Sequence, residues 1–336
     1  KISKKLFKEY QKFFLPLVIL TMSLSVNYQM FSTFRGETYI LFFSTLIFMV
    51  LLKISESEKK NFISYLAISL LIGFLLLSRQ WSVFFLPTIF FFWIINKNSR
   101  KNKKNMFYAL FLSGLIGIVI ATPFYTSLIE KENSITAWNG DSYQINLSKY
   151  PASFYTELGF SKGFFTNPTE TNSNFKRYTN GESIFPAFVS SIWGDPNGYF
   201  SYTHLRNGER DQSFEQYLGL VNLISLFLIG LSAAGIFKFF QKSEEVKSSQ
   251  EVLFFKLVIF NFFSTFLFYI IWMYLYLPSI NANYMLQITN LLPFFGAYYI
   301  YKIKNRKFYN YTIITLVIVY IFFIPTFIYG SSYLLN

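Results

Sequence analysis

The chain alternates long apolar runs with short polar segments. A helix needs about 20 apolar residues to cross the ~30 Å core of a bilayer, and nine runs come near that length. We therefore predict an all-α integral membrane protein whose transmembrane helices occupy residues 13–31, 38–53, 62–78, 81–96, 106–128, 217–240, 252–277, 284–301 and 308–328. The third and fourth runs are short and closely joined, which fits a tight helical hairpin or two tilted helices.

One long segment, residues 129–216, separates the fifth run from the sixth. Its stretches SFYTELGFSKGFF (153–165) and SIFPAFVSSIWGDPNGYF (183–200) are rich in aromatic residues, which a disordered segment lacks. The second stretch is apolar enough to form a short interfacial helix before WGDPNGY turns the chain. The predicted organisation is therefore five membrane helices (1–128), a loop domain with interfacial helices (129–216) and four membrane helices (217–336).

The basic residues predict the orientation of these helices, because cytoplasmic loops are enriched in lysine and arginine. With the N-terminal end in the cytoplasm, most of the 30 basic residues fall in the predicted cytoplasmic segments 1–12, 53–61, 97–105, 238–256 and 302–307. The tract KNSRKNKK (97–104) is the strongest of these signals. The loop 129–216 is then exoplasmic. The absence of an internal repeat argues against an inverted-repeat transporter.

Composition narrows the chemistry further. Of the 336 residues, 53% are hydrophobic and 14% charged, against about a quarter charged in soluble domains. There is no cysteine, so disulfides and cysteine nucleophiles are excluded, and one histidine leaves almost no room for a zinc or iron site. The net charge of +13 is explained by the topology signals and does not point to nucleic acid. No cofactor or divalent metal is implied.

Three groups of charged residues on the predicted outer side are not explained by topology. Charged groups near membrane spans are costly, so each indicates function by default. Arg35 and Glu37 lie in the first outer turn, where they line a site or form a local ion pair. Arg79 lies in the next outer turn. Its guanidinium either binds a lipid phosphate bidentately or simply extends to the lipid head groups. In the second case Trp81 is an aromatic residue at the lipid interface.

The third group lies in the long loop. Trp193 and Asp195 pair an aromatic face with a carboxylate, a combination that stacks on a sugar ring and accepts its hydroxyl hydrogens; the alternative is a turn in which Asp195 caps its own backbone. His204 and Arg206 follow. His204 either contacts substrate or is a surface residue.

Four segments resemble the multi-spanning glycosyltransferases of the GT-C class, the protein-mannosyltransferase and aminoarabinose-transferase-like group. They are SVNYQMFSTFRGETYILFFSTLIFMVLL (25–52), LLIGFLLLSRQWSVFFLPTIFFFWI (70–94), SSIWGDPNGYF (190–200) and NYMLQITNLLPFFGAYYI (283–300).

The resemblance implies a bacterial or archaeal plasma-membrane enzyme. Such an enzyme transfers a sugar from a polyprenyl-phosphate donor to a glycan, lipid or protein acceptor on the exoplasmic face. The family's main catalytic carboxylate lies in the loop after its first span, whereas the first two spans of this chain look like the family's third and fourth. The resemblance therefore implies an N-terminally truncated chain that is inactive by itself.

The resemblance also implies roles for single residues. Glu37 matches the family's second acidic position. The candidate residues are then Glu37 and Asp195 for catalysis, Arg79, Arg35 and Tyr284 for the donor phosphate, and Trp193, His204 and Arg206 for the acceptor. Glycosyl transfer needs a carboxylate that positions or activates a hydroxyl and a cation that stabilises the departing phosphate. We therefore predict that Arg35, Glu37, Arg79 and the stretch 190–211 converge on one outer cavity, with Glu37 and Arg79 within about 15 Å of each other.

Two other functions stay open at this point. An O-antigen polymerase or ligase also has many spans and one late outer loop, and would depend most on His204 and Arg206. A non-enzymatic transporter of lipid-linked sugars would need polar residues at mid-membrane, whereas most polar residues here lie near the ends of the spans.

Overall fold

A computed structural model describes the parts of the chain on which the following rests: residues 10–32, 36–56, 62–96, 103–132, 152–160, 164–165, 183–194, 212–241, 249–276 and 282–332. Every regular element within these ranges is helical. The chain divides into two compact units that interleave along the sequence. Unit 1 comprises Lys1–Leu6, Arg35–Gln144 and Ser243–Ile270, and unit 2 comprises Phe7–Phe34, Ile145–Lys242 and Ile271–Asn336.

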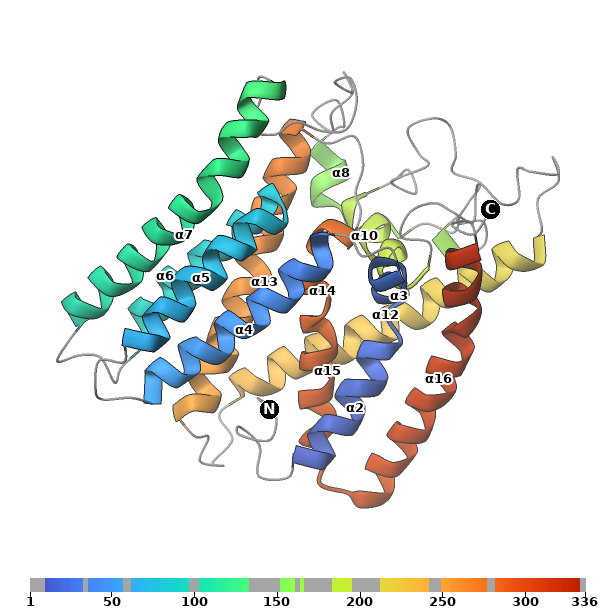
Figure 1. Ribbon diagram of the computed structural model, residues 1–336. Helices are drawn as coiled ribbons and strands as arrows, with labels where there is room; N and C mark the ends of the chain where they lie inside the picture. The colour runs from blue at the N-terminus through green and yellow to red at the C-terminus, as the bar shows by residue number, and fades with distance from the viewer. Residues whose placement is uncertain are drawn as a thin grey trace. The chain divides into compact units, whose positions relative to one another are not determined.

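The α-helices of each unit are labelled in Figure 1. Unit 1 holds α4 (Gly36–Glu56), α5 (Phe62–Ser78), η1 (Gln80–Phe85), α6 (Leu86–Ile95), α7 (Lys103–Glu132) and most of α13 (Ser249–Tyr276). Unit 2 holds α2 (Tyr10–Met22), α3 (Ser25–Ser32), α8 (Ala152–Thr156), α10 (Ile184–Trp193), α12 (Gln212–Phe240), η5 (Ala282–Met285), α14 (Leu286–Thr289), α15 (Leu291–Tyr301) and α16 (Arg306–Ser332).

Five of the described helices are long and apolar enough to cross a membrane. They span Gly36–Glu56, Lys103–Lys131, Gln216–Phe240, Gln250–Ile271 and Arg306–Phe327. The prediction of an all-helical membrane protein is confirmed to this extent. The full count of nine spans stays a prediction, since the other apolar helices are shorter.

Three of the predicted spans are broken helices, which corrects the expectation of one continuous helix in each. Residues 13–31 form α2 and α3, residues 81–96 form η1 and α6, and residues 284–301 form η5, α14 and α15. In the second case Pro87 lies in the first turn of α6. Proline is tolerated there but cannot continue a helix from the preceding turn, so the residues before it take the tighter 3₁₀ form.

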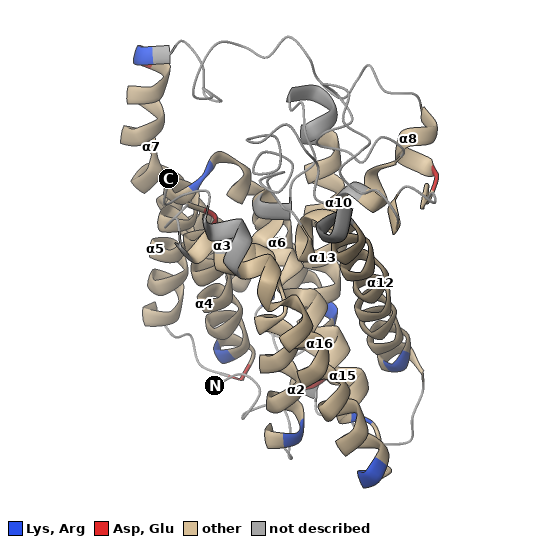
Figure 2. Ribbon diagram, turned by 90° about the vertical axis from the view of Figure 1, so that its right-hand side faces the viewer, with Lys and Arg blue, Asp and Glu red and all other residues tan. Residues whose placement is uncertain are grey.

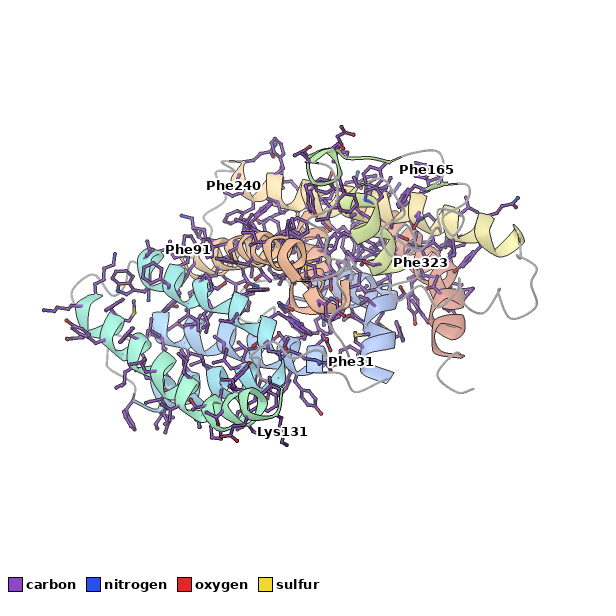
Figure 3. All side chains as sticks on the ribbon, turned by 90° about the horizontal axis from the view of Figure 1, so that it is seen from above. Phe31, Phe91, Lys131, Phe165, Phe240 and Phe323 are labelled. Atoms are coloured by element: carbon purple, nitrogen blue, oxygen red, sulfur yellow. The ribbon has the colours of Figure 1, made fainter. Side chains whose placement is uncertain are left out.

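Contacts within unit 1 fix the relative directions of its helices. Ser113 of α7 donates to the carbonyl of Tyr65 on α5 at 3.1 Å, and Tyr125 donates to Leu76 at 2.9 Å, so α5 and α7 run parallel. On α6, Phe91 stacks on Phe260 of α13 with ring centroids 4.0 Å apart. Figure 3 shows Phe91 beside α13.

Unit 2 is organised around α15. Lys12 at the start of α2 donates to the carbonyl of Ile303, just after α15, at 2.8 Å, whereas Asn27 on α3 pairs with Asn290 at the start of α15. Hence α2–α3 and α15 are antiparallel. In contrast α12 runs parallel to α15, because Ser232 donates to the carbonyl of Leu292 at 2.8 Å and, three residues later, Gly235 packs against the carbonyl of Phe295.

These directions agree with the alternation that the sequence predicts within each unit. In unit 2 the basic residues at the start of α2, the end of α12 and the start of α16 gather at the lower ends of the helices in Figure 2. This grouping is what the charge pattern of the sequence predicts for one membrane face. That this face is cytoplasmic stays a prediction.

Candidate functional site

In unit 1 the beginning of α4 lies very close to the end of α5. Gly36 opens α4, and a side chain there would lie 2.5 Å from the carbonyl oxygen of Ser78 and 2.8 Å from Nε of Arg79. Only glycine therefore lets the beginning of α4 pack against the end of α5. The next residue, Glu37, occupies the first turn of α4, where the partial positive charge of the helix N-terminus favours a carboxylate.

Glu37 and Arg79 form an ion pair, with Arg79 Nε 3.5 Å from Glu37 Oε1. The Glu37 side chain is 1% exposed and that of Arg79 is 40% exposed. Neither carboxylate oxygen of Glu37 has a hydrogen-bond partner in the described part of the chain. The pair is therefore a buried carboxylate with unused acceptor capacity beside a cation that still faces outward. The predicted proximity of Glu37 and Arg79 is confirmed, whereas their convergence with Arg35 and the stretch 190–211 stays a prediction.

Trp81 holds the other side of the arginine. The Arg79 guanidinium carbon lies 5.3 Å from the centre of the Trp81 ring, within the range of a cation–π contact. Trp81 is 2% exposed, so it is a packed residue of unit 1, and the alternative in which it is an aromatic at the lipid interface is wrong. Ring and carboxylate together restrict the guanidinium, which leaves its outward nitrogens available for an anion.

Two other predicted residues, Trp193 and Tyr284, lie in unit 2. Trp193 ends α10 and is 2% exposed. This end of α10 is fixed by Ser25 of α3, whose hydroxyl donates to the carbonyl of Ile192 at 3.0 Å. Helix α10 also contacts α12 and η5, and η5 contains the half-buried Tyr284. Trp193 and Tyr284 therefore lie on neighbouring elements of one unit.

The remaining predicted residues, Arg35, Asp195, His204 and Arg206, lie outside the described residues. Within the described ranges no group of three histidine, aspartate or glutamate residues could hold a metal ion.

Several polar residues of interest were not predicted from the sequence. Asn261 in the middle of α13 accepts from Thr88 of α6 at 2.9 Å and from Thr265 at 3.2 Å. In unit 2, Gln287 is buried. It lies between Tyr284 and Asn290 in the sequence. Their spacing within apolar runs was the available signal, but a lone amide in such a run does not reveal what it faces.

One comparison with known families gives a match. Residues 1–125 match a family model described as Dolichyl-phosphate-mannose-protein mannosyltransferase. The resemblance to the GT-C class of membrane glycosyltransferases is confirmed over this part of the chain. The matched residues include Glu37, Arg79 and Trp81, but not Trp193 or Tyr284. Searches of the curated proteins and of the solved structures found no match to the chain.

Proposed function

We propose that the protein is a glycosyltransferase that moves a sugar from a polyprenyl-phosphate donor to a hydroxyl acceptor on the exoplasmic face of the membrane. The observation that carries the proposal is the ion pair of the buried Glu37 with the part-exposed Arg79. The family match to residues 1–125, which contain both, supports it.

Arg79 is the donor-binding residue in this proposal. Its guanidinium is always charged and offers two parallel donors to a phosphate. Glu37 and Trp81 hold one edge and one face of the group, so less conformational entropy is lost when the phosphate binds. As the sugar leaves, negative charge grows on the phosphate oxygen, and a fixed cation beside it stabilises the transition state.

Glu37 is the acceptor-positioning carboxylate. In a direct displacement the acceptor oxygen forms a bond to the anomeric carbon while the bond from that carbon to the phosphate oxygen breaks, and its electron pair goes to the phosphate. The acceptor hydroxyl loses its proton in the same step. A carboxylate with two free acceptor sites orients that hydroxyl and receives its proton.

The other sequence candidates complete the proposal. Arg35 and Tyr284 assist in binding the phosphate, Asp195 is a second catalytic carboxylate, and Trp193, His204 and Arg206 contact the acceptor. In this proposal the chain has nine spans and the loop 129–216 lies on the exoplasmic side.

The test is transfer of radiolabelled mannose from polyprenyl-phosphate mannose by membranes that contain the full-length protein. Glu37→Gln keeps the shape of the side chain and removes its charge and basicity. We expect transfer to fall about 10²-fold or more, the usual contribution of a general base. Glu56→Gln is the matched control, since it makes the same change on an exposed residue at the other end of α4. Transfer by Glu37→Gln within about threefold of wild type would refute the proposed role.

A further inference from the structure

The polar residue that the proposed site leaves unexplained is Gln287, on the short helix α14 of unit 2. It is 3% exposed, and neither its Oε1 nor its Nε2 has a hydrogen-bond partner in the described residues. Buried polar groups of native proteins are almost always paired, because an unpaired group loses its bonds to water without replacement. An amide with both ends unpaired therefore needs an explanation.

The helix that carries Gln287 is interrupted on both sides. The predicted span 284–301 is divided into η5, α14 and α15, and Gln287 lies in the four-residue middle piece. Broken helices at membrane depth occur where they are buried in protein or line a binding site, and they form the substrate sites of many transport proteins. The break therefore points to a ligand independently of the unpaired amide.

The neighbouring amides show that unit 2 satisfies such groups elsewhere. Asn290 lies three residues after Gln287 and exchanges two hydrogen bonds of 2.9 Å with Asn27 of α3. Asn290 also donates to the carbonyl of Leu286 at 2.9 Å. This pair closes the contact between α3 and the break. Gln287, by contrast, keeps both ends of its amide unpaired within the described residues.

A second unpaired group lies on an adjoining element. The indole Nε1 of Trp193, at the end of α10, is buried without a hydrogen-bond partner in the described residues. Helix α10 contacts η5, which continues directly into α14, and Figure 1 shows α10 close to this break. One donor from Trp193 and a donor and an acceptor from Gln287 are thus held on elements that pack together.

The charge of this region determines the class of ligand. The buried charged side chains of the described residues are Glu37 and Glu251, and both belong to unit 1. A phosphate buried near Gln287 would therefore have no described cation to neutralise it. A hydroxyl group both donates and accepts, and so matches an amide and an indole N–H.

We propose that Gln287 and Trp193 form a binding site for the hydroxyl groups of an uncharged sugar ring. The choice of a sugar rests on the proposed function, and the site deepens it by giving unit 2 a role in recognising the sugar. Both side chains are buried, so binding requires α10 to separate from the break enough to admit the ring.

The experiment measures the melting temperature of the full-length protein in lipid nanodiscs against the concentration of methyl α-mannoside. A ligand that binds the folded state raises Tm in a saturable manner. We expect Gln287→Leu to leave the Tm without glycoside unchanged or higher, because it removes an unpaired group, and to weaken the apparent affinity at least about tenfold. Trp193→Phe removes only the indole N–H and should also weaken it.

Thr289→Val is the matched control. Thr289 lies on the same short helix and is fully buried, but its hydroxyl already donates to the carbonyl of Leu286 at 3.1 Å. It should keep the response to the glycoside. Inorganic phosphate replaces the glycoside as a second probe, and should give no response that depends on Gln287.

Two results would overturn the site. One is a wild-type protein whose Tm does not respond to the glycoside. The other is a Gln287→Leu variant that loses stability but keeps the response, which would mean that the amide holds only internal water. Glu37→Gln separates this inference from the proposed function, because it should abolish transfer and leave the Tm response intact. Transfer that survives Glu37→Gln would contradict the proposed function alone.

Discussion

Two polar regions of this apolar protein differ in the charge of their buried side chains. In unit 1 the beginning of α4 and the end of α5 carry a buried carboxylate and a part-exposed guanidinium 3.5 Å apart. The break between η5 and α15 in unit 2 carries only amides, hydroxyls and an indole, with Asn27 and Asn290 paired and Gln287 unpaired.

The difference concerns which groups each region can bind. A buried carboxylate is tolerated when a cation lies beside it, and an arginine that stays partly in water can contact a second anion as well. A neutral amide region has no charge to offer a phosphate, but it supplies donors and acceptors to hydroxyl groups. The charged region of unit 1 therefore fits an anionic phosphate, and the neutral region of unit 2 fits uncharged hydroxyl groups.

The variant with the largest expected effect removes Arg79, the cation beside Glu37. Arg79→Ala leaves the Glu37 carboxylate buried and unpaired, and it removes the proposed phosphate contact. We expect a loss of transfer of about 10²–10³-fold and a loss of stability of about 1–3 kcal/mol, below the 3–5 kcal/mol of fully buried pairs because Arg79 is partly solvated.

The double variant Glu37→Gln/Arg79→Ala separates the two effects of Arg79→Ala. Removing both charges should recover most of the stability, since no buried charge is left alone, and none of the transfer. Thermal unfolding in nanodiscs and the mannose transfer assay measure the two quantities. Equal stability of Arg79→Ala and the double variant would show that the unpaired Glu37 carboxylate is not what destabilises Arg79→Ala.

Substitutions of packed glycines should have a smaller effect on function, and they compare helix packing within each of the two units. In unit 2 a side chain at Gly235 of α12 would overlap the backbone carbonyl of Phe295, whereas at Gly117 of unit 1 it would meet mainly the side chain of Ile72. A backbone group yields less than a side chain. We expect Gly235→Ala to cost about 2–3 kcal/mol and Gly117→Ala about 1–2 kcal/mol, the range of overpacked cores.

Each of these glycines has a control in its own helix. Gly230 of α12 and Gly114 of α7 have open space where a side chain would be. Alanine at either site should leave stability equal or raise it by up to about 1 kcal/mol, because alanine is the better helix former. Thermal unfolding of the four variants gives the comparison, and equal losses at Gly235 and Gly230 would contradict the close packing of α12 on α15.

The smallest effect concerns the neutral pair of unit 2. Asn290→Leu leaves the Asn27 amide with less hydrogen bonding inside the protein, at a cost of about 1–2 kcal/mol. The double variant Asn27→Leu/Asn290→Leu should lose less than the two single variants together, since both unsatisfied groups are gone. Thermal unfolding measures all three, and strict additivity would show that the reciprocal pair contributes no coupling.

The amino-acid sequence predicts much of the fold because a bilayer imposes lengths and charge patterns that can be read locally. The apolar runs give the helices, and their alternation gives the relative directions that pairs of contacts bear out within each unit. The orientation that the basic clusters indicate stays a prediction. The breaks in three spans were not predicted, because hydropathy reports apolar length and not helical continuity. Pro87 and Pro293, each in the first turn of the helix that follows a break, gave a local signal.

For the site, the sequence singled out Glu37 and Arg79, since charges at the ends of spans are rare and costly. Their contact, and the burial of Trp81 beside them, depended on how α4 packs on α5 at Gly36. Gln287 is a second case in which the sequence does not show the contacts of a polar residue. Its identity is in the sequence, but whether an amide in an apolar run is paired depends on residues far away along the chain, and only the tertiary structure decides which of them it meets.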